Sequence, residues 1–373
     1  MKRILHISKY YYPFRGGTEQ VARDCVNALR EHFEQEVICF NESNRTYIDS
    51  VDSIKIIRVG CFTKISSQSL SLTYGRILRN EIQDYNPDII VFHYPNPFVA
   101  YYLLKEIKQN IRLVLYWHLD IVKQRILKNF FVNQNFNLIR RADLIIATSP
   151  QYIDGSKYLA SVREKCVVIP NCVNEDRLEI NMKIENRAAE IRRNNQGKTI
   201  CVAVGRHTRY KGFDLLIQAA HMLDDSFCFY LIGKGEETRR LKRVAGDDKK
   251  IWFLGLVNED ELKSYMLAAD IFCFPSVTKN EAFGISLAEA MYYGKPAVTF
   301  TVPGSGVNYV CLNNENGIEV PSRDVGAYAR ALSVLSSDNN ARERLGAAGR
   351  RRVLNYFTTK QYISHMNSII ADL

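Results

Sequence analysis

The chain has 373 residues and a formal net charge of +10 at pH 7, with 46% hydrophobic and 24% charged residues. This balance excludes a disordered chain, and the length exceeds one ordinary core, so it predicts two domains. No apolar stretch approaches the length of a membrane span, and the N-terminal MKRILHIS starts a strand where a secretory signal would have its apolar region. The nine cysteines form no CxxC pair and no metal-ligand spacing, which favours buried thiols in a reducing, cytoplasmic compartment.

The positive charge favours partners that carry phosphate or an anionic surface. Lys and Arg are spread along the chain, without a basic tail, and no zinc finger, basic zipper or RNA-binding strand motif is present. The sequence therefore argues against nucleic acid. Phosphate-bearing ligands and the headgroups of an anionic membrane remain the better candidates.

Short β-branched runs alternate with helical patterns along the whole chain. In the first half the predicted strands are 4–8, 37–40, 54–59, 88–93, 113–118, 144–149 and 167–170, and in the second half 200–205, 228–233, 251–255, 271–275 and 297–300. Helical patterns lie between them, for example at 19–30, 213–222, 259–268 and 284–293. Strands that are apolar throughout and alternate with helices indicate parallel sheets covered on both faces. The sequence thus predicts an α/β protein of two doubly wound, Rossmann-like domains, joined by the polar stretch 174–198.

The carboxyl ends of the strands are where open α/β sheets bind ligands, and two facing sheets place the site in the cleft between the domains. Gly16-Gly17 follows the first predicted strand and precedes a helix, so its backbone N–H groups can approach an anion. A simple strand-to-helix turn explains the same two glycines equally well. His118 ends a later strand of the first half, where it is a candidate for bonding a sugar hydroxyl, although a lone His is usually structural.

The first predicted strand of the second half ends at Gly205, and it is followed by Arg206 and, at the start of the next helix, by Lys211. Two cations beside a helix N-terminus suit a diphosphate. Solvated surface side chains are the alternative, and the position at a strand end favours the functional interpretation.

The segment NEAFGISLAEAM places Glu281 before a helix and Glu289 in its second turn, with Phe283 and Gly284 at the predicted helix start. Eight helical residues turn through about 800°, so the two carboxylates can share a broad face. In the alternative, Glu281 complements the helix dipole and Glu289 is solvated. Apolar neighbours of Glu289 argue against that alternative.

Several common catalytic signatures are missing from the sequence. It contains no D-x-D, Walker A, G-x-S-x-G or H-E-x-x-H motif. A nucleoside diphosphate leaving group would therefore have to be met by Arg206, Lys211 and helix dipoles, and we expect no cofactor and no metal.

Together, Gly16-Gly17, Gly205-Arg206, Lys211-Gly212 and Glu281-x7-Glu289 resemble the retaining nucleotide-sugar glycosyltransferases of family 4, also called group 1, which have the GT-B fold. The likeness covers nearly the whole chain. It implies an acceptor-side domain at 1–173, a nucleotide-sugar domain at 199–355 and a C-terminal helix at 356–373 that crosses back to the first domain.

The resemblance also implies roles for these residues. Arg206 and Lys211 would hold the donor diphosphate, and Glu289 would bond the ribose. Glu281, with the backbone around Phe283 and Gly284, would hold the sugar. The Gly16-Gly17 loop would close on the phosphates and acceptor, and His118 would contact the sugar near its 6-hydroxyl.

A narrower likeness to bacterial O-antigen and polysaccharide mannosyltransferases appears in WHLDIVKQ, RYKGFDLL and GSGVNYV. It implies mannose transfer from GDP-mannose, with retention by front-face attack, to a lipid-linked glycan at the cytoplasmic face of the inner membrane. Alternatives are a UDP-sugar hexosyl or N-acetylhexosaminyl transferase of the same family and a non-catalytic nucleotide-sugar-binding protein. An epimerase would need other acid–base groups, and a phosphorylase would need a cofactor lysine that the sequence does not identify. Residues 121–141 mix Lys and Arg with Phe and are a candidate lipid-contacting segment, although a helix packed on its own sheet is the more ordinary interpretation.

Overall fold

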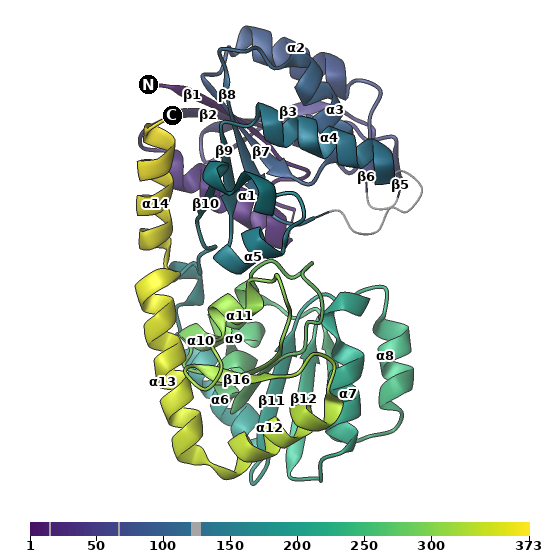
Figure 1. The fold of residues 1–373 in the computed structure, drawn as a ribbon. Coiled ribbons are helices and arrows are strands. Elements are labelled where there is room, and N and C mark those ends of the chain that lie inside the picture. The colour runs from purple at the N-terminus through teal and green to yellow at the C-terminus, as the bar shows by residue number, and fades with distance from the viewer. Residues whose placement is uncertain (15, 66–67, 121–127) are drawn as a thin grey trace. The chain divides into compact units, whose positions relative to one another are not determined.

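A computed structural model describes all residues except 15, 66–67 and 121–127, and the side chains of 65 and 128–131 are also left undescribed. The chain divides into two compact units, one made of Met1–Ile169 with Tyr362–Leu373 and the other of Pro170–Gln361. Each unit has its own sheet. Figure 1 follows the chain through both units by colour.

The first unit is built on a sheet whose described strands run in the order β10-β9-β8-β7-β1-β2-β4-β3. All neighbours are parallel except β3 and β4, which are antiparallel. Their bounds are β1 (Arg3–Ile7), β2 (Glu34–Phe40), β3 (Tyr47–Val51), β4 (Ile54–Val59), β7 (Ile89–Tyr94), β8 (Arg112–Trp117), β9 (Leu144–Ala147) and β10 (Cys166–Val168). A separate hairpin pairs β5 (Thr63–Ile65) with β6 (Gln68–Leu70).

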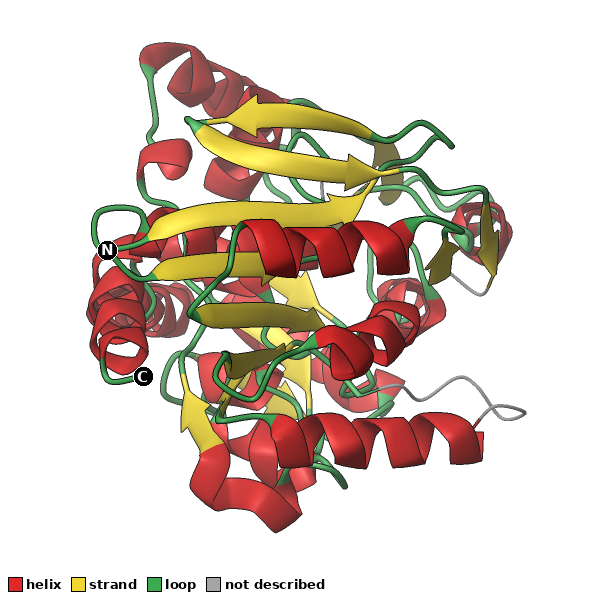
Figure 2. Ribbon diagram, turned by 90° about the horizontal axis from the view of Figure 1, so that it is seen from above, coloured by secondary structure: helices red, strands yellow, loops and turns green. Residues whose placement is uncertain are grey.

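Helices accompany this sheet, as Figure 2 shows by secondary structure. They are α1 (Gly17–Leu29), α2 (Tyr74–Asp84), α3 (Pro97–Glu106), α4 (Lys128–Arg141), α5 (Pro150–Gly155), the 3-10 helix η1 (Ala160–Lys165) and α14 (Thr359–Ala371). Every residue of β7 is buried, as expected for a central strand of a parallel sheet. The side chain of Asn367 in α14 donates to the carbonyl of Ala28 at 3.0 Å, which attaches the C-terminal helix to α1.

The second unit is built on a fully parallel sheet in the order β13-β12-β11-β14-β15-β16. Its strands are β11 (Thr199–Val204), β12 (Phe227–Ile232), β13 (Ile251–Gly255), β14 (Ile271–Phe274), β15 (Ala297–Phe300) and β16 (Gly317–Val320). Its helices are η2 (Asp176–Leu178), α6 (Met182–Asn194), η3 (Arg209–Lys211), α7 (Phe213–His221), α8 (Thr238–Ala245), α9 (Glu259–Ala268), α10 (Ile285–Tyr292), α11 (Val307–Val310), α12 (Val325–Ser337) and α13 (Asn339–Tyr356).

Two apolar clusters in the second unit account for its three-layer form (Figure 1). In one, α6, α9, α10 and α13 contribute to the core on one sheet face, with Ile191, Met266 and Leu287 among the buried residues. In the other, α7, α8 and α12 contribute residues such as Leu216 and Leu332. Both faces of the sheet are therefore covered at the central strands β11, β12, β14 and β15, which explains why these strands are continuous apolar runs in the sequence.

The predicted α/β alternation is confirmed, and the differences have physical reasons. Strand β3 went unpredicted because it is a polar, largely exposed edge strand without an apolar run. The stretch 174–198, interpreted as a polar joint, contains η2 and α6, and α6 turns only Ile184, Ala188 and Ile191 inward. Within the described residues, no helix combines the length and the apolar character that crossing a bilayer requires.

Candidate active site

A largely buried ion pair lies at the carboxyl ends of β11 and β14. Lys211 ends η3 after β11, and Glu281 lies in the segment between β14 and α10. The Lys211 ammonium contacts Glu281 Oε2, and each side chain is only 12% exposed. The hydroxyl of Ser276 donates to the same carboxylate oxygen at 3.0 Å. Lys211 and Glu281, which were predicted to make separate contacts with the donor, are thus direct partners of each other in the structure.

The environment keeps Lys211 protonated. Burial by itself lowers the pKa of Lys211, but the adjacent Glu281 carboxylate raises it, and the net result is a pKa above the ordinary lysine value. The ammonium also lies 5.1 Å from the centre of the Phe274 ring. A cation fixed in this way at a strand end can bind an anion without being reorganised first.

Glycine backbone geometry brings this cation close to β14. Gly212, directly after Lys211, has φ +64°, and a Cβ atom there would lie 2.1 Å from the carbonyl oxygen of Pro275. Only a glycine permits this approach. Gly205, at the end of β11, lies against the Lys211 side chain, and a Cβ on Gly233 would lie 2.0 Å from the Gly205 carbonyl oxygen.

The helix α10 begins directly behind the ion pair. Gly284 precedes it with φ +96°, and no side chain caps its N-terminus. The loop before it is held by two bonds, from the Ser305 hydroxyl to the carbonyl of Glu281 and from the Gly306 N–H to the carbonyl of Ala282 at 3.1 Å. Phe283 is buried against Phe357. The N-terminus of α7 also lacks a side-chain cap. Backbone N–H groups at such termini favour anions.

Glu289 belongs to a different set of contacts from Glu281. It is 8% exposed, so the interpretation of Glu289 as a solvated helix position is wrong. Its Oε1 lies 3.8 Å from a guanidinium nitrogen of Arg177, which also pairs with Glu259 at 3.4 Å. Arg177, Glu289 and Tyr293 line one small pocket. Arg177 was not among the predicted site residues, because it lies in the stretch interpreted as a joint and belongs to no motif.

A larger pocket of about 330 Å³ opens beside β12 and β13. It is lined by His207, Gly233, Lys234, Thr238, Lys242, Phe253, Leu254, Gly255 and Leu256. Its lysines and the backbone of two glycines provide donors, and its apolar side chains provide a surface for a flat group. Arg206, by contrast, is exposed and has no ion-pair partner within the described part of the chain.

The remaining predicted residues belong to the first unit. His118 directly follows β8 and is buried, with its Nε2 3.1 Å from His93 Nδ1. Burial lowers the pKa of His118 to about 3, so its imidazole is neutral. Gly16 and Gly17 lie at the start of α1. Gly16 is the N-cap residue, so no side chain caps this helix N-terminus. A Cβ on Gly16 would lie 2.2 Å from Glu19 Oε2, so this carboxylate already lies over the glycine.

Two protein-family models match the sequence of this chain. Residues 15–177 match the model for Glycosyltransferase Family 4, and residues 185–352 match the model for Glycosyl transferases group 1. Between them the two matches leave only short segments of the chain uncovered.

The chain is a group 1, family 4 glycosyltransferase. Its fold is GT-B, as predicted. The sucrose-phosphate synthase of Thermosynechococcus elongatus superposes with a TM-score of 0.82 at 19% identity, covering 100% of this chain and 99% of that one.

Curated relatives match this glycosyltransferase over almost its full length. The O-antigen chain mannosyltransferase C of Escherichia coli is 27% identical and covers 97% of this chain and 96% of its own. The D-rhamnosyltransferase WbpZ of Pseudomonas aeruginosa is 26% identical, over 95% of this chain and 92% of its own.

Proposed function

We propose that this glycosyltransferase moves mannose from GDP-mannose, with retention, onto a lipid-linked oligosaccharide in the synthesis of O-antigen or a related cell-surface polysaccharide. The observation that carries the proposal is the buried Lys211–Glu281 pair beside the uncapped start of α10. The names of the relatives from Escherichia coli and Pseudomonas aeruginosa support the hexosyl class and the polysaccharide product.

In this proposal the donor diphosphate takes the place of Glu281 as the partner of Lys211. The phosphates then meet the Lys211 ammonium, the Arg206 guanidinium and the N–H groups at the starts of α7 and α10. Glu281 turns to the hydroxyls of the donor sugar, and Glu289 bonds the ribose. The charge that develops on the leaving diphosphate is stabilised by these fixed groups, without a metal and without an enzyme nucleophile.

His118 is proposed to contact the donor sugar, and the Gly16-Gly17 loop is proposed to contact the acceptor and phosphates. A neutral His118 can donate or accept one hydrogen bond but carries no charge to a sugar hydroxyl. This agrees with a role in binding more than with electrostatic stabilisation by an imidazolium.

A donor panel tests the proposal. We expect nucleotide release with GDP-mannose, in the presence of a crude lipid-linked acceptor and of EDTA, to exceed release with GDP-D-rhamnose, GDP-fucose, UDP-glucose, UDP-galactose and UDP-N-acetylglucosamine. Turnover with a UDP-sugar alone would instead assign the UDP-dependent alternative. Nucleotide binding with no turnover on any donor would assign the non-catalytic alternative.

Contact with the cytoplasmic face of the inner membrane is part of the same proposal. The candidate segment 121–141 lies partly outside the described residues, while Phe136 within it is 41% exposed. The basic excess of the chain is suited to anionic lipid. Flotation with vesicles of phosphatidylglycerol and phosphatidylethanolamine at low salt should carry the protein upward, and its absence from the floated fraction would remove this part of the proposal.

A further inference from the structure

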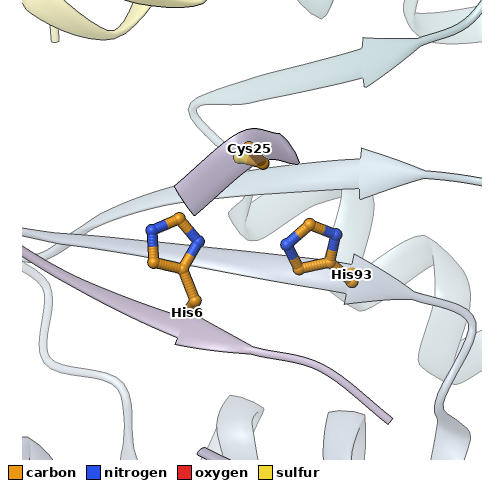
Figure 3. A group of neighbouring side chains, drawn as sticks. All are labelled: His6, Cys25 and His93. Carbon is orange, nitrogen blue, oxygen red and sulfur yellow. The ribbon is translucent and has the colours of Figure 1, made fainter. Parts of the chain in front are cut away.

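Three metal-ligating side chains meet inside the first unit, and none of the three is itself assigned to the donor. They are His6 on β1, Cys25 on α1 and His93 on β7, each no more than 1% exposed. One ligand atom from each lies within 4.8 Å of the others. Figure 3 shows the two imidazoles side by side, with the cysteine on the helix beside them.

Hydrogen bonds determine which ring nitrogen of His6 is left to face Cys25 and His93. Gln35 Nε2 donates to the carbonyl of Val26 at 3.0 Å, and this sets the orientation of the Gln35 amide. Its Oε1 therefore accepts from His6 Nε2 at 2.8 Å. The proton of a neutral His6 is thus on Nε2, and Nδ1 presents a lone pair. This buried Nδ1 has no hydrogen-bond partner in the described structure.

A hydrogen bond to the other ring nitrogen also orients His93. Its Nδ1 lies 3.1 Å from His118 Nε2, while its buried Nε2 also has no hydrogen-bond partner among the described residues. Metal-binding histidines characteristically use the second ring nitrogen for such an orienting bond. Leaving two buried ring nitrogens without a partner is costly unless something binds both.

We propose that His6 Nδ1, His93 Nε2 and Cys25 Sγ bind one thiophilic metal ion of the Zn²⁺ or Cu⁺ type. A thiolate with two imidazoles is a ligand set that suits these soft to borderline ions. Metal–nitrogen bonds of about 2.0 Å and metal–sulfur bonds of about 2.3 Å place the ligand atoms roughly 3.3–3.8 Å apart. Metal binding therefore requires the ligand atoms, now within 4.8 Å of one another, to approach by up to about 1.0–1.5 Å.

Charge and ligand number distinguish the two ions. Cu⁺ with one thiolate is neutral and is satisfied by three ligands, so burial costs it little. Zn²⁺ would keep one positive charge and take a fourth ligand, such as a water molecule. In either case the ion ties α1 to β1 and β7. None of its ligands is assigned to the diphosphate, so its main effect is expected on stability, and it is linked to the proposed sugar contact through the hydrogen bond between His93 and His118.

Metal counting on the full-length protein tests the site. Protein stripped with a chelator would be incubated with Zn²⁺, or anaerobically with Cu⁺, then desalted and measured for metal per chain. Co²⁺ serves as a spectroscopic probe, because a bound thiolate gives a near-ultraviolet sulfur-to-cobalt charge-transfer band. The variants are Cys25→Ala and His6→Gln. The matched control is Cys228→Ala, which removes an equally buried thiol from the second unit.

We expect one equivalent of Zn²⁺ or Cu⁺, a rise in Tm on metal addition and a charge-transfer band with Co²⁺. All three should be lost in Cys25→Ala and in His6→Gln but kept in Cys228→Ala. The same metal content and the same Tm shift in Cys25→Ala and the wild type would overturn the proposal, and so would less than 0.1 equivalent of either ion in the wild type. Should Cys25→Ala not fold, the comparison of His6→Gln with Cys228→Ala decides.

Discussion

At the scale of single residues, the donor site is organised by a buried pair of opposite charges. Lys211 and Glu281 pair with each other, so their charges are mutually compensated. Removing one partner of such a pair is strongly destabilising, because the other charge stays buried without compensation. Loss of activity in a single variant would therefore mix two causes, a missing phosphate contact and a weakened fold.

A double variant separates these causes. Lys211→Met should lower both turnover, by about 10²–10³-fold, and the free energy of unfolding, by about 3–5 kcal/mol. Lys211→Met with Glu281→Gln removes both charges and should recover most of that stability, measured by urea denaturation, but none of the turnover. Recovery of turnover in the double variant would contradict the assignment of Lys211 to the diphosphate.

Arg206 allows a cleaner test, because it is exposed and makes no ion pair in the described structure. Arg206→Ala should lower kcat/KM by about 10²-fold or more through lost stabilisation of the leaving group, with Tm unchanged. Arg209→Ala is the control. Arg209 is an exposed arginine of the same loop, 80% exposed, and it is paired with Glu237 and not assigned to the donor. Equal activity of the two variants would argue against the role of Arg206.

At the scale of elements, the site depends on where helices begin. The helices α7 and α10 each start after a glycine with positive φ, at Gly212 and Gly284. These glycines turn the chain sharply enough to place uncapped N–H groups beside the strand ends. The glycines of Lys211-Gly212 and Phe283-Gly284 thus matter for the positive φ that starts each helix, in addition to the side chains beside them.

Gly212→Ala should show this dependence. The new methyl group would meet the carbonyl oxygen of Pro275, and both are backbone-anchored, so we expect a loss of several kcal/mol of stability and of donor binding. Gly197→Ala is the matched control, because Gly197 also has positive φ, +79°, but nothing lies within 4 Å of its added Cβ. It should lose only about 1 kcal/mol. Thermal unfolding and a nucleotide-binding titration measure both effects, and equal losses would exclude the backbone contact as the cause.

At the scale of the whole molecule, buried histidines make stability depend on pH. Burial lowers the pKa of His6 to about 4 and that of His118 to about 3, against about 6.5 in an unfolded chain. Between these values the unfolded chain binds more protons than the folded one. The free energy of unfolding that depends on these neutral histidines is therefore fully present above about pH 6.5, and it is lost as the pH falls toward 4.

The free energy of unfolding of the metal-free protein should thus fall between pH 7 and pH 5, by up to about 1.4 kcal/mol per pH unit for each histidine. Urea denaturation at several pH values measures the slope. His6→Asn should reduce it, whereas His32→Asn, which changes an exposed histidine, should not. An unchanged slope in His6→Asn would show that His6 does not contribute.

The candidate site was predictable from sequence to the extent that it is local. Glu281 and Glu289 are separated by one helix start, and Arg206 and Lys211 by one turn, so their motifs could be read directly. The contact of Lys211 with Glu281 joins segments that follow different strands, and that of Arg177 with Glu289 joins α10 to a stretch without any motif. The roles of these residues toward the donor remain predictions that the variants above test.

The sequence by itself determined the family, the alternation of strands and helices and the positions of the signature residues, because each depends on patterns of a few neighbouring residues. Only the tertiary structure decided which of them touch. The β1–β7 pairing and the packing of α1 bring His6, Cys25 and His93 together across 87 positions of sequence. No spacing rule could detect that group, since parallel strands are joined by long crossovers and their neighbours are set by the register of the sheet.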